Sequence, residues 1–224
     1  MTRDQLHINF KIAMDKNSQS VAFGACPAFL PEEIDYWLNL AVLQEVSNKY
    51  TGQNSLKQPF EQSIKRIHDL EKLVQTEKNI IATKELNTNC CYILDLFGDE
   101  KMFYVGATLN FDDKKSQVIV IQHAQVDRFK KTYNNNPWIE TPVAVLENNS
   151  IYIYYDDIAM NANNYSIDLT YVATPIKVEN LTPLNDPFPE YMWEEIVNRA
   201  VELALENIES KRYQTKLQIN QLDE

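Results

Sequence analysis

The sequence predicts an α+β fold, in which an N-terminal helical hairpin and a C-terminal helix pack with an inserted antiparallel β-sandwich or small barrel. Apolar residues recur at three- and four-residue intervals near both ends of the chain, which is the period of an amphipathic helix. From about Ile80 to Glu179 the period changes to two, which is the period of a strand. This β-rich part shows no strand–helix–strand alternation, so an antiparallel arrangement is expected.

The first helix of the hairpin is predicted over residues 31–50, in the stretch FLPEEIDYWLNLAVLQEVSNKYTG. Pro31 suits the first helical position, where no backbone N–H is needed, and Gly52 lies just beyond the end. Glu32 and Glu33 place negative charge at the N-terminal end of the helix dipole. The apolar stripe is broad, and we therefore expect this helix to be covered on more than one side.

The second helix of the hairpin is predicted over residues 59–76, in PFEQSIKRIHDLEKLVQT, after a short polar connection. Its apolar residues again recur at intervals of three and four. The segment before the hairpin, residues 1–29, gives a different signal. Leu6, Ile8, Phe10 and Ile12 alternate with polar residues, and this alternation predicts a strand or an extended arm.

Five or six antiparallel strands are predicted in the middle of the chain, because its segments are rich in β-branched and aromatic residues. These segments are CCYILDLFGD, KMFYVGATLN, SQVIVIQHAQ, PVAVLENN, SIYIYYDD and SIDLTYVATPIKV. The turns between them are expected at 98–100, 112–115 and 147–150. The stretch 127–138 contains the run NNNP, which does not suit a strand interior, and a long surface loop is expected there.

A last helix is predicted from Pro189 onward, with a wide apolar face that continues to Ile208. The expected organisation is a helical body formed by 1–79 and 181–212, an antiparallel β domain at 80–180, and a C-terminal tail at 213–224. The tail is too polar for a core, yet it carries Tyr213, Leu217 and Leu222 as interface candidates. Two alternatives stand for it: a disordered terminus, or an arm that orders on a neighbouring subunit.

The overall charge and hydropathy limit the partners. The formal net charge of −11 argues against wrapping nucleic acid, which requires a basic face, but suits a wall along which DNA slides. No apolar run reaches the roughly 18 residues that a membrane span needs, so no membrane partner is expected. The N-terminus lacks the apolar region of a signal peptide.

No catalytic, cofactor-binding or metal site is predicted. His7, His68 and His123 are far apart and lack ligand spacing. The three cysteines are expected to be reduced thiols, and none lies in a catalytic signature. The four glycines form no phosphate-binding motif. What remains is a surplus of apolar and aromatic surface, which is typical of a non-enzymatic subunit of an assembly.

Four segments together carry a family resemblance: LPEEIDYWLNLAVLQEV, PFEQSIKRIHDLEKL, SIDLTYVATPIKV and FPEYMWEEIVNRAVELALENIESKRYQ. Across roughly residues 30–215 the chain resembles the neck or ring proteins of the head–tail connector in crAss-like tailed bacteriophages. The resemblance implies a structural virion protein, assembled in the host cytoplasm, that forms a closed ring, commonly twelvefold. It also implies contacts with the portal protein and with other neck or tail proteins, around a channel through which DNA passes without specific binding.

An alternative of a different class is a virion module that binds carbohydrate or a host receptor. It rests on the aromatic strands and on the NNNPW stretch, since sugar sites favour exposed aromatic residues beside Asn and Asp. Trp138 is the first candidate for such a contact.

Overall fold

The fold is mixed α+β, with helices at both ends of the chain and two sheets between them, as the sequence predicts. The computed structural model describes residues 1–17, 29–52, 62–81, 83–84, 90–93, 100–111, 114–131, 137–138, 140–147, 149–155 and 165–207. The chain divides into two compact units. A helical unit comprises Met1–Lys72 and Pro175–Glu224, and a β unit comprises Leu73–Thr174.

The elements follow one another along the chain within these two units. The helical unit contains α1 (Arg3–Asn17), α2 (Pro31–Thr51), α3 (Ile64–Leu70), the short 3₁₀ helix η4 (Val178–Asn180) and α5 (Glu190–Asn207). The β unit contains β1 (Val74–Ile81), β2 (Thr83–Lys84), β3 (Cys90–Ile93), β4 (Lys101–Phe111), β5 (Lys114–Gln117), β6 (Ile119–Val120), α4 (His123–Lys131), β7 (Val143–Glu147), β8 (Ser150–Tyr154) and β9 (Tyr165–Ala173).

Helix α2 begins and ends where its sequence signals lie. Pro31 is its first residue, and the Glu33 carboxylate accepts a hydrogen bond of 2.8 Å from the backbone N–H of Leu30. Gly52 takes a left-handed conformation with φ of 75°, and its N–H donates to the Asn48 carbonyl at 3.0 Å. A residue with a Cβ would be strained in this conformation, which explains why glycine ends the helix.

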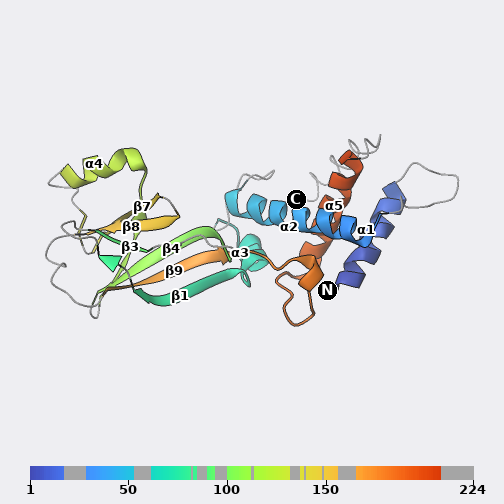
Figure 1. Ribbon diagram of the computed structural model, residues 1–224, viewed down its shortest axis with the longest axis horizontal. Coiled ribbons are helices and arrows are strands. Elements are labelled where there is room, and N and C mark those ends of the chain that lie inside the picture. The colour runs from blue at the N-terminus through green and yellow to red at the C-terminus, as the bar shows by residue number, and fades with distance from the viewer. Residues whose placement is uncertain are drawn as a thin grey trace. The chain divides into compact units, whose positions relative to one another are not determined.

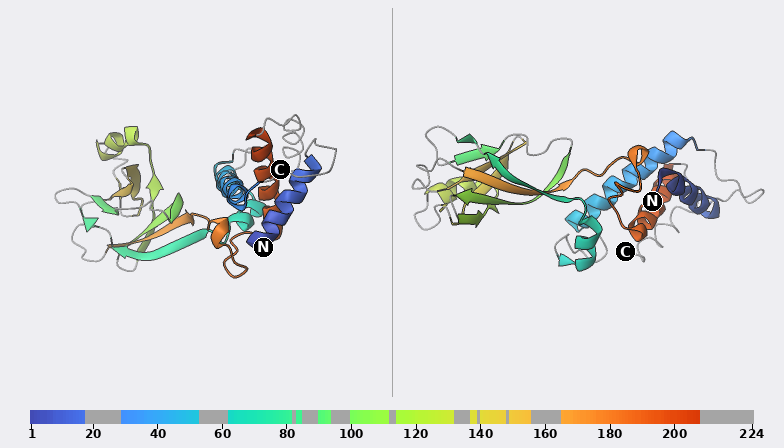
Figure 2. Two further views of the ribbon diagram at one scale, coloured as in Figure 1. Left: turned by 45° about the vertical axis from the view of Figure 1, so that its right-hand side comes forward. Right: turned by 90° about the horizontal axis from the view of Figure 1, so that it is seen from below.

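Helices α2 and α5 form the centre of the helical unit and cross each other (Figure 1). Arg199 Nε donates to Gln44 Oε1 at 3.1 Å, and Lys49 Nζ lies 2.7 Å from Glu195 Oε2, so these polar contacts join the C-terminal half of α2 to the middle of α5. Helix α1 packs against both helices (Figure 2). The buried face of α5 consists of Met192, Trp193, Ile196, Val197, Ala200, Val201, Ala204 and Leu205.

Residues 3–17 form a helix, so the expected strand or extended arm is wrong for this part of the chain. Leu6, Phe10 and Met14 are fully buried at four-residue intervals, whereas the intervening Ile8 and Ile12 are exposed. The start of α1 is also fixed locally. Thr2 Oγ1 accepts from the Gln5 N–H at 3.3 Å, and Gln5 Oε1 accepts from the Thr2 N–H at 3.0 Å, which is a capping box. Residues 18–28 lie outside the described part.

The predicted second helix over 59–76 is wrong in its extent. Residues 59–61 lie outside the described part, α3 ends at Leu70, and β1 begins at Val74, where it pairs with Val172 of β9. The apolar residues at helical spacing do not all bury a face, since Ile64 is 87% exposed. Pairing with β9 therefore outweighs the weak local preference for helix at 74–76.

The two sheets of the β unit pack over one core. The antiparallel sheet has the strand order β1-β9-β4-β5, and the mixed sheet has the order β2-β3-β8-β7-β6. Figure 1 shows β7 and β8 lying over β4 and β9. Inward side chains from both sheets form the core: Ala107, Leu109, Val118, Ala144, Ile151, Ile153, Tyr155, Ile167, Leu169, Tyr171 and Ala173. The chain passes from one sheet to the other at Val118, whose N–H donates to the Ala107 carbonyl at 2.9 Å.

One strand pair departs from the antiparallel prediction, and a helix accounts for it. Strand β6 runs parallel to β7, and α4 connects them. A parallel pair requires a crossover connection, which α4 supplies, so the expectation of no strand–helix–strand unit is wrong here. Residues 127–131 are the end of α4 rather than part of a surface loop, and residues 132–136 lie outside the described part.

The hairpin prediction at 147–150 is confirmed. Strands β7 and β8 pair antiparallel from Val143 to Glu147, and Asn149 takes a positive φ of 58° in the turn. The two ends of the β unit lie next to each other. The N–H of Ala173 donates to the Leu73 carbonyl at 2.7 Å, so the chain enters and leaves this unit at adjacent backbone positions.

Candidate functional site

One polar cluster of the helical unit joins α2, α3 and α5. Lys49 Nζ lies 3.1 Å from Asp69 Oδ2 and 2.7 Å from Glu195 Oε2, and Tyr191 donates a hydrogen bond to Asp69 Oδ1. Lys65 approaches the other oxygen of Glu195 at 3.3 Å. Asp69 is buried and only a small part of the Lys49 side chain is exposed, whereas 56% of the Lys65 side chain is exposed. Lys49 is therefore the internal connection of this cluster.

The electrostatics of this cluster keep its protons in place. Burial alone would lower the pKa of Lys49, but the hydrogen bonds and charges of Glu195 and Asp69 outweigh it and the pKa is raised. Burial and the adjacent Asp69 carboxylate raise the pKa of Tyr191 well above its usual value. Both groups therefore keep their protons at neutral pH, and the cluster joins the three helices through ion pairs and a hydrogen bond.

A shallow depression lies beside this cluster on the surface of α3 and α5. It is lined by Lys65, Tyr191, Glu194, Glu195 and Asn198. Lys65 Nζ sits 5.8 Å from the centre of the Tyr191 ring, so the ring and the lysine stem form one wall. The charges of Lys65 and Glu195 are already paired with each other.

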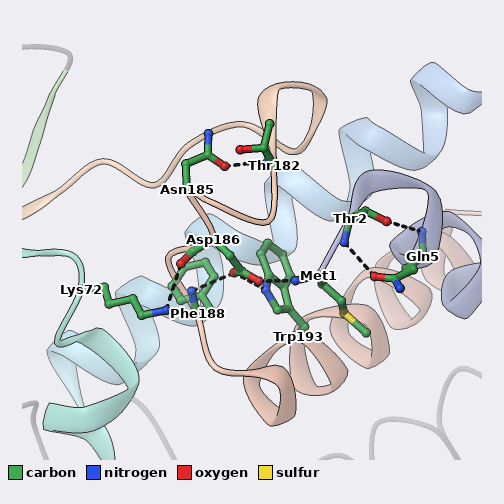
Figure 3. Close-up of polar contacts among 9 residues, drawn as sticks. All are labelled: Met1, Thr2, Gln5, Lys72, Thr182, Asn185, Asp186, Phe188 and Trp193. Atoms are coloured by element: carbon green, nitrogen blue, oxygen red, sulfur yellow. Dashed lines mark hydrogen bonds and ion pairs between the residues drawn. The ribbon is translucent and has the colours of Figure 1, made fainter.

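A second cluster centres on Asp186, in the loop that leads into α5 (Figure 3). Its Oδ1 accepts hydrogen bonds from Trp193 Nε1 at 2.7 Å and from the Phe188 N–H at 3.1 Å, and its Oδ2 contacts the Met1 ammonium. Lys72 Nζ donates to the Asp186 carbonyl at 3.1 Å. Burial would raise the pKa of Asp186, but the hydrogen bonds from the ammonium and from Trp193 outweigh it and the pKa is lowered.

The turn before Asp186 carries the most exposed apolar side chain among the described residues. Leu184 is 100% exposed. Around it, Asn185 Oδ1 accepts from the Thr182 N–H at 2.6 Å, the Asn185 N–H donates to the Thr182 carbonyl at 3.1 Å, and Asn185 Nδ2 donates to the Asn180 carbonyl at 3.1 Å. One asparagine thus holds both sides of the turn.

Helix α2 is apolar on two opposite sides. Its inner face is buried against the rest of the helical unit, with Ile34, Leu38, Ala41, Val42 and Val46. On the other side Tyr36, Leu40 and Leu43 follow one another at helical spacing, a set called the outer stripe below. Tyr36 is 60% and Leu43 is 42% exposed, and Leu40 is partly buried. The Tyr36 ring contacts Trp37 edge to face, with ring centres 5.0 Å apart.

The site residues predicted from sequence have different outcomes. Trp138 is exposed, and its carbonyl accepts from the Thr141 N–H at 3.0 Å in an isolated β-bridge. Tyr213, Leu217 and Leu222 lie outside the described residues. Sequence reasoning missed the cluster around Lys49 and the turn at Leu184. The stretch TPLNDP at 182–187 is rich in Pro, Asn and Asp, which is a local signal for a turn.

The described part of the chain offers neither a metal site nor a membrane span. No group of three His, Cys, Asp or Glu residues there is placed to hold a metal ion. No described helix is long and apolar enough to cross a membrane.

Comparison with known proteins places the chain in no family. No protein-family model matches it, and no curated protein matches it.

Proposed function

We propose that this protein is a structural subunit of an oligomeric ring in the head–tail connector of a crAss-like tailed bacteriophage. The single observation that carries the proposal is the outer stripe of α2. A helix whose apolar residues lie on two opposite sides buries one side within its own fold and needs a partner for the other. A neighbouring subunit of a ring supplies such a partner.

The proposed ring is closed, with twelve as the common number of subunits, and lies below the portal protein. In such a ring each subunit uses two different patches, one for each neighbour. The net charge of −11 suits a channel wall, because negative charge repels the DNA phosphates and leaves the DNA free to move. The protein acts in the virion after assembly in the host cytoplasm, with the portal and other neck or tail proteins as partners and without catalysing a reaction.

The proposal is tested by measuring particle mass with light scattering and symmetry with electron microscopy, alone and with purified portal rings. We expect a ring, or a complex on the portal. The double variant Tyr36→Glu, Leu43→Glu places two charges on the outer stripe and should abolish assembly while circular dichroism stays unchanged. Glu32→Lys, at the exposed start of the same helix, is the control for altered charge. A strict monomer that also fails to bind portal rings contradicts the proposal.

A second candidate function is a virion module that binds carbohydrate or a receptor. The exposure of Trp138, whose backbone is bonded to Thr141, favours it, because sugar rings stack on exposed aromatic faces. A glycan array with the wild type and Trp138→Ala decides it. Binding by the wild type that the variant loses supports this function, and no binding by either protein removes it.

A further inference from the structure

Arg66 on α3 is a buried cation without a partner among the described residues. The residue is 8% exposed, and its Nη1 is buried and has no hydrogen-bond partner. No hydrogen bond or ion pair joins any nitrogen of its guanidinium group to a described residue. Buried arginines are almost always paired, because a charge taken out of water without a partner is costly. Arg66 therefore requires a negative group that the described residues do not supply.

The position of Arg66 on the helix explains its burial. Asp69 and Leu70, three and four residues further along α3, are buried on the same side. A long arginine stem is often buried while its charged head stays in water. Here Nη1 of the head itself is buried, so this common arrangement does not account for Arg66. Nη1 is the one guanidinium nitrogen out of reach of solvent, so Nε and Nη2 form an accessible edge.

The acidic groups next to α3 are held by other cations. Asp69 Oδ2 lies 3.1 Å from Lys49 Nζ, and its Oδ1 accepts a hydrogen bond from a tyrosine of α5. Glu195 is held through both oxygens by Lys49 and Lys65, at 2.7 and 3.3 Å. The three cations Lys49, Lys65 and Arg66 thus outnumber the two carboxylates of Asp69 and Glu195 by one positive charge.

We propose that the accessible edge of the Arg66 guanidinium binds one oxyanion, a carboxylate or a phosphate group, supplied from outside the chain. Two parallel N–H donors, on Nε and Nη2, match two oxygens of such a group, which neutralises the charge and fixes the orientation of the ligand. The source is a free anion or a carboxylate of a second copy, and the experiment below distinguishes the two. The inference goes beyond the proposed ring and does not depend on it.

The test observes the Arg66 side chain itself in the full chain. Its Nε–Hε signal in the NMR spectrum of ¹⁵N-labelled protein is assigned by its absence in Arg66→Lys. The signal is followed while sodium phosphate or sodium acetate is added at constant ionic strength, and we expect a saturable shift with either anion. In a second arm the protein is diluted without added anion. A signal that moves on dilution identifies a carboxylate of a second copy as the ligand.

Thermal unfolding gives a second readout of the same site. Phosphate at about a hundred times its dissociation constant should raise the unfolding midpoint of the wild type by roughly 5–10 °C, compared with sodium chloride of equal ionic strength. Arg66→Met keeps the length of the stem without the charge and should lose this shift. Arg66→Lys keeps the charge but not the two parallel donors, and should bind phosphate about tenfold more weakly.

Lys65→Met is the matched control, because it removes the exposed cation next to Arg66. It should keep the phosphate shift of the wild type, and it reports the stabilisation that phosphate gives to any protein by exclusion from the surface. Movement of the Nε–Hε signal with an added anion supports a free anion, and movement on dilution alone supports a second copy. A signal that responds to neither anion nor to dilution overturns the inference, whatever the thermal shift.

Discussion

Nε2 of His7 lies 2.7 Å from Oδ1 of Asp35, and this contact ties α1 to the start of α2. Arg3 completes it, with Nη2 at 2.5 Å from Oδ2 and Nε at 3.2 Å from Oδ1 of the same carboxylate. Asp35 is buried, so its charge depends on these two partners. The N-terminal helix is thus held by an ionic contact as well as by its apolar face.

Removing the Asp35 carboxylate should weaken the attachment of α1 to α2. Asp35→Asn leaves Arg3 and His7 without their acceptor charge, and we expect a loss of roughly 2–3 kcal/mol in the free energy of unfolding. Urea denaturation followed by circular dichroism measures it. Glu32→Gln, which changes an exposed carboxylate of the same helix, is the control and should cost a few tenths of a kcal/mol.

The same variant should change the pH dependence of stability. Burial would raise the pKa of Asp35, but the hydrogen bonds from Arg3 and His7 outweigh it and hold the pKa below 3.8. Because the pKa is lower in the folded state, this carboxylate stabilises the fold above about pH 4, and the stabilisation is lost as the pH falls through the folded value. The stability difference between wild type and Asp35→Asn should therefore shrink below pH 4. A difference that is constant down to pH 2 would contradict this assignment.

Two lysines that contact one carboxylate should differ strongly in their contribution to stability. Lys49→Met leaves the buried Asp69 without its cation and Glu195 with Lys65 alone, and should cost roughly 3–5 kcal/mol. Lys65→Met removes the other, exposed cation from Glu195, and should cost less than about 1 kcal/mol. Thermal unfolding of both variants checks the ranking. Equal losses would show that Lys49 is not the internal connection of the cluster.

Tyr171 gives a prediction for alkaline pH in the β unit. Its hydroxyl donates to Glu77 Oε1 at 2.9 Å and lies 3.3 Å from Gln75 Oε1, and burial together with Glu77 raises its pKa to about 12. Because the pKa is higher in the folded state, the protonated phenol stabilises the fold fully below pH 10, and this stabilisation is lost as the pH rises to about 12. Tyr171→Phe should cost about 1 kcal/mol at pH 7 and nothing near pH 12. Spectroscopic titration of the tyrosines at 295 nm, compared between the two proteins, checks the assignment.

Two isoleucines should separate the core of the β unit from its surface. Ile153 on β8 is fully buried, and Ile153→Ala should cost about 2–5 kcal/mol through lost burial and the cavity that remains. Ile81 on β1 is largely exposed, and the same substitution should cost less than about 0.5 kcal/mol. Denaturation midpoints of the two variants give the comparison. Similar losses would contradict the packing of the two sheets.

The sequence predicts local structure where residues close together in the chain determine it. Pro31 and Gly52 mark the ends of α2, and the turn at Asn149 follows from residues that tolerate a positive φ. The sequence does not predict local structure where the same apolar residues fit both the helical period and the strand period. Leu6 and Phe10 fit both an alternating pattern and a helical one. In the structure they are buried while Ile8 between them is exposed, which identifies the helix.

The candidate site could not be predicted because its contacts are distant in sequence. Lys49 and Glu195 are separated by 146 residues, and nothing local to either residue indicates the other. The parallel pair β6–β7 was missed for a related reason, since α4 is short and polar and its preceding strand has two residues. The fixed turn at Leu184 and Asn185 is not predicted by the sequence either, because the hydrogen bonds that fix it depend on its folded shape.

The hydrogen bond between Ala173 and Leu73 has a consequence for the evolution of this protein. Two chain positions that already touch can be rejoined by a linker of a few residues, so residues 73–174 form a cassette that recombination can remove, exchange or transplant without breaking the path of the remaining chain. Relatives should then share one half of this molecule while differing wholly in the other. Expressed alone, the cassette should give a strand-type circular dichroism spectrum and a cooperative melt.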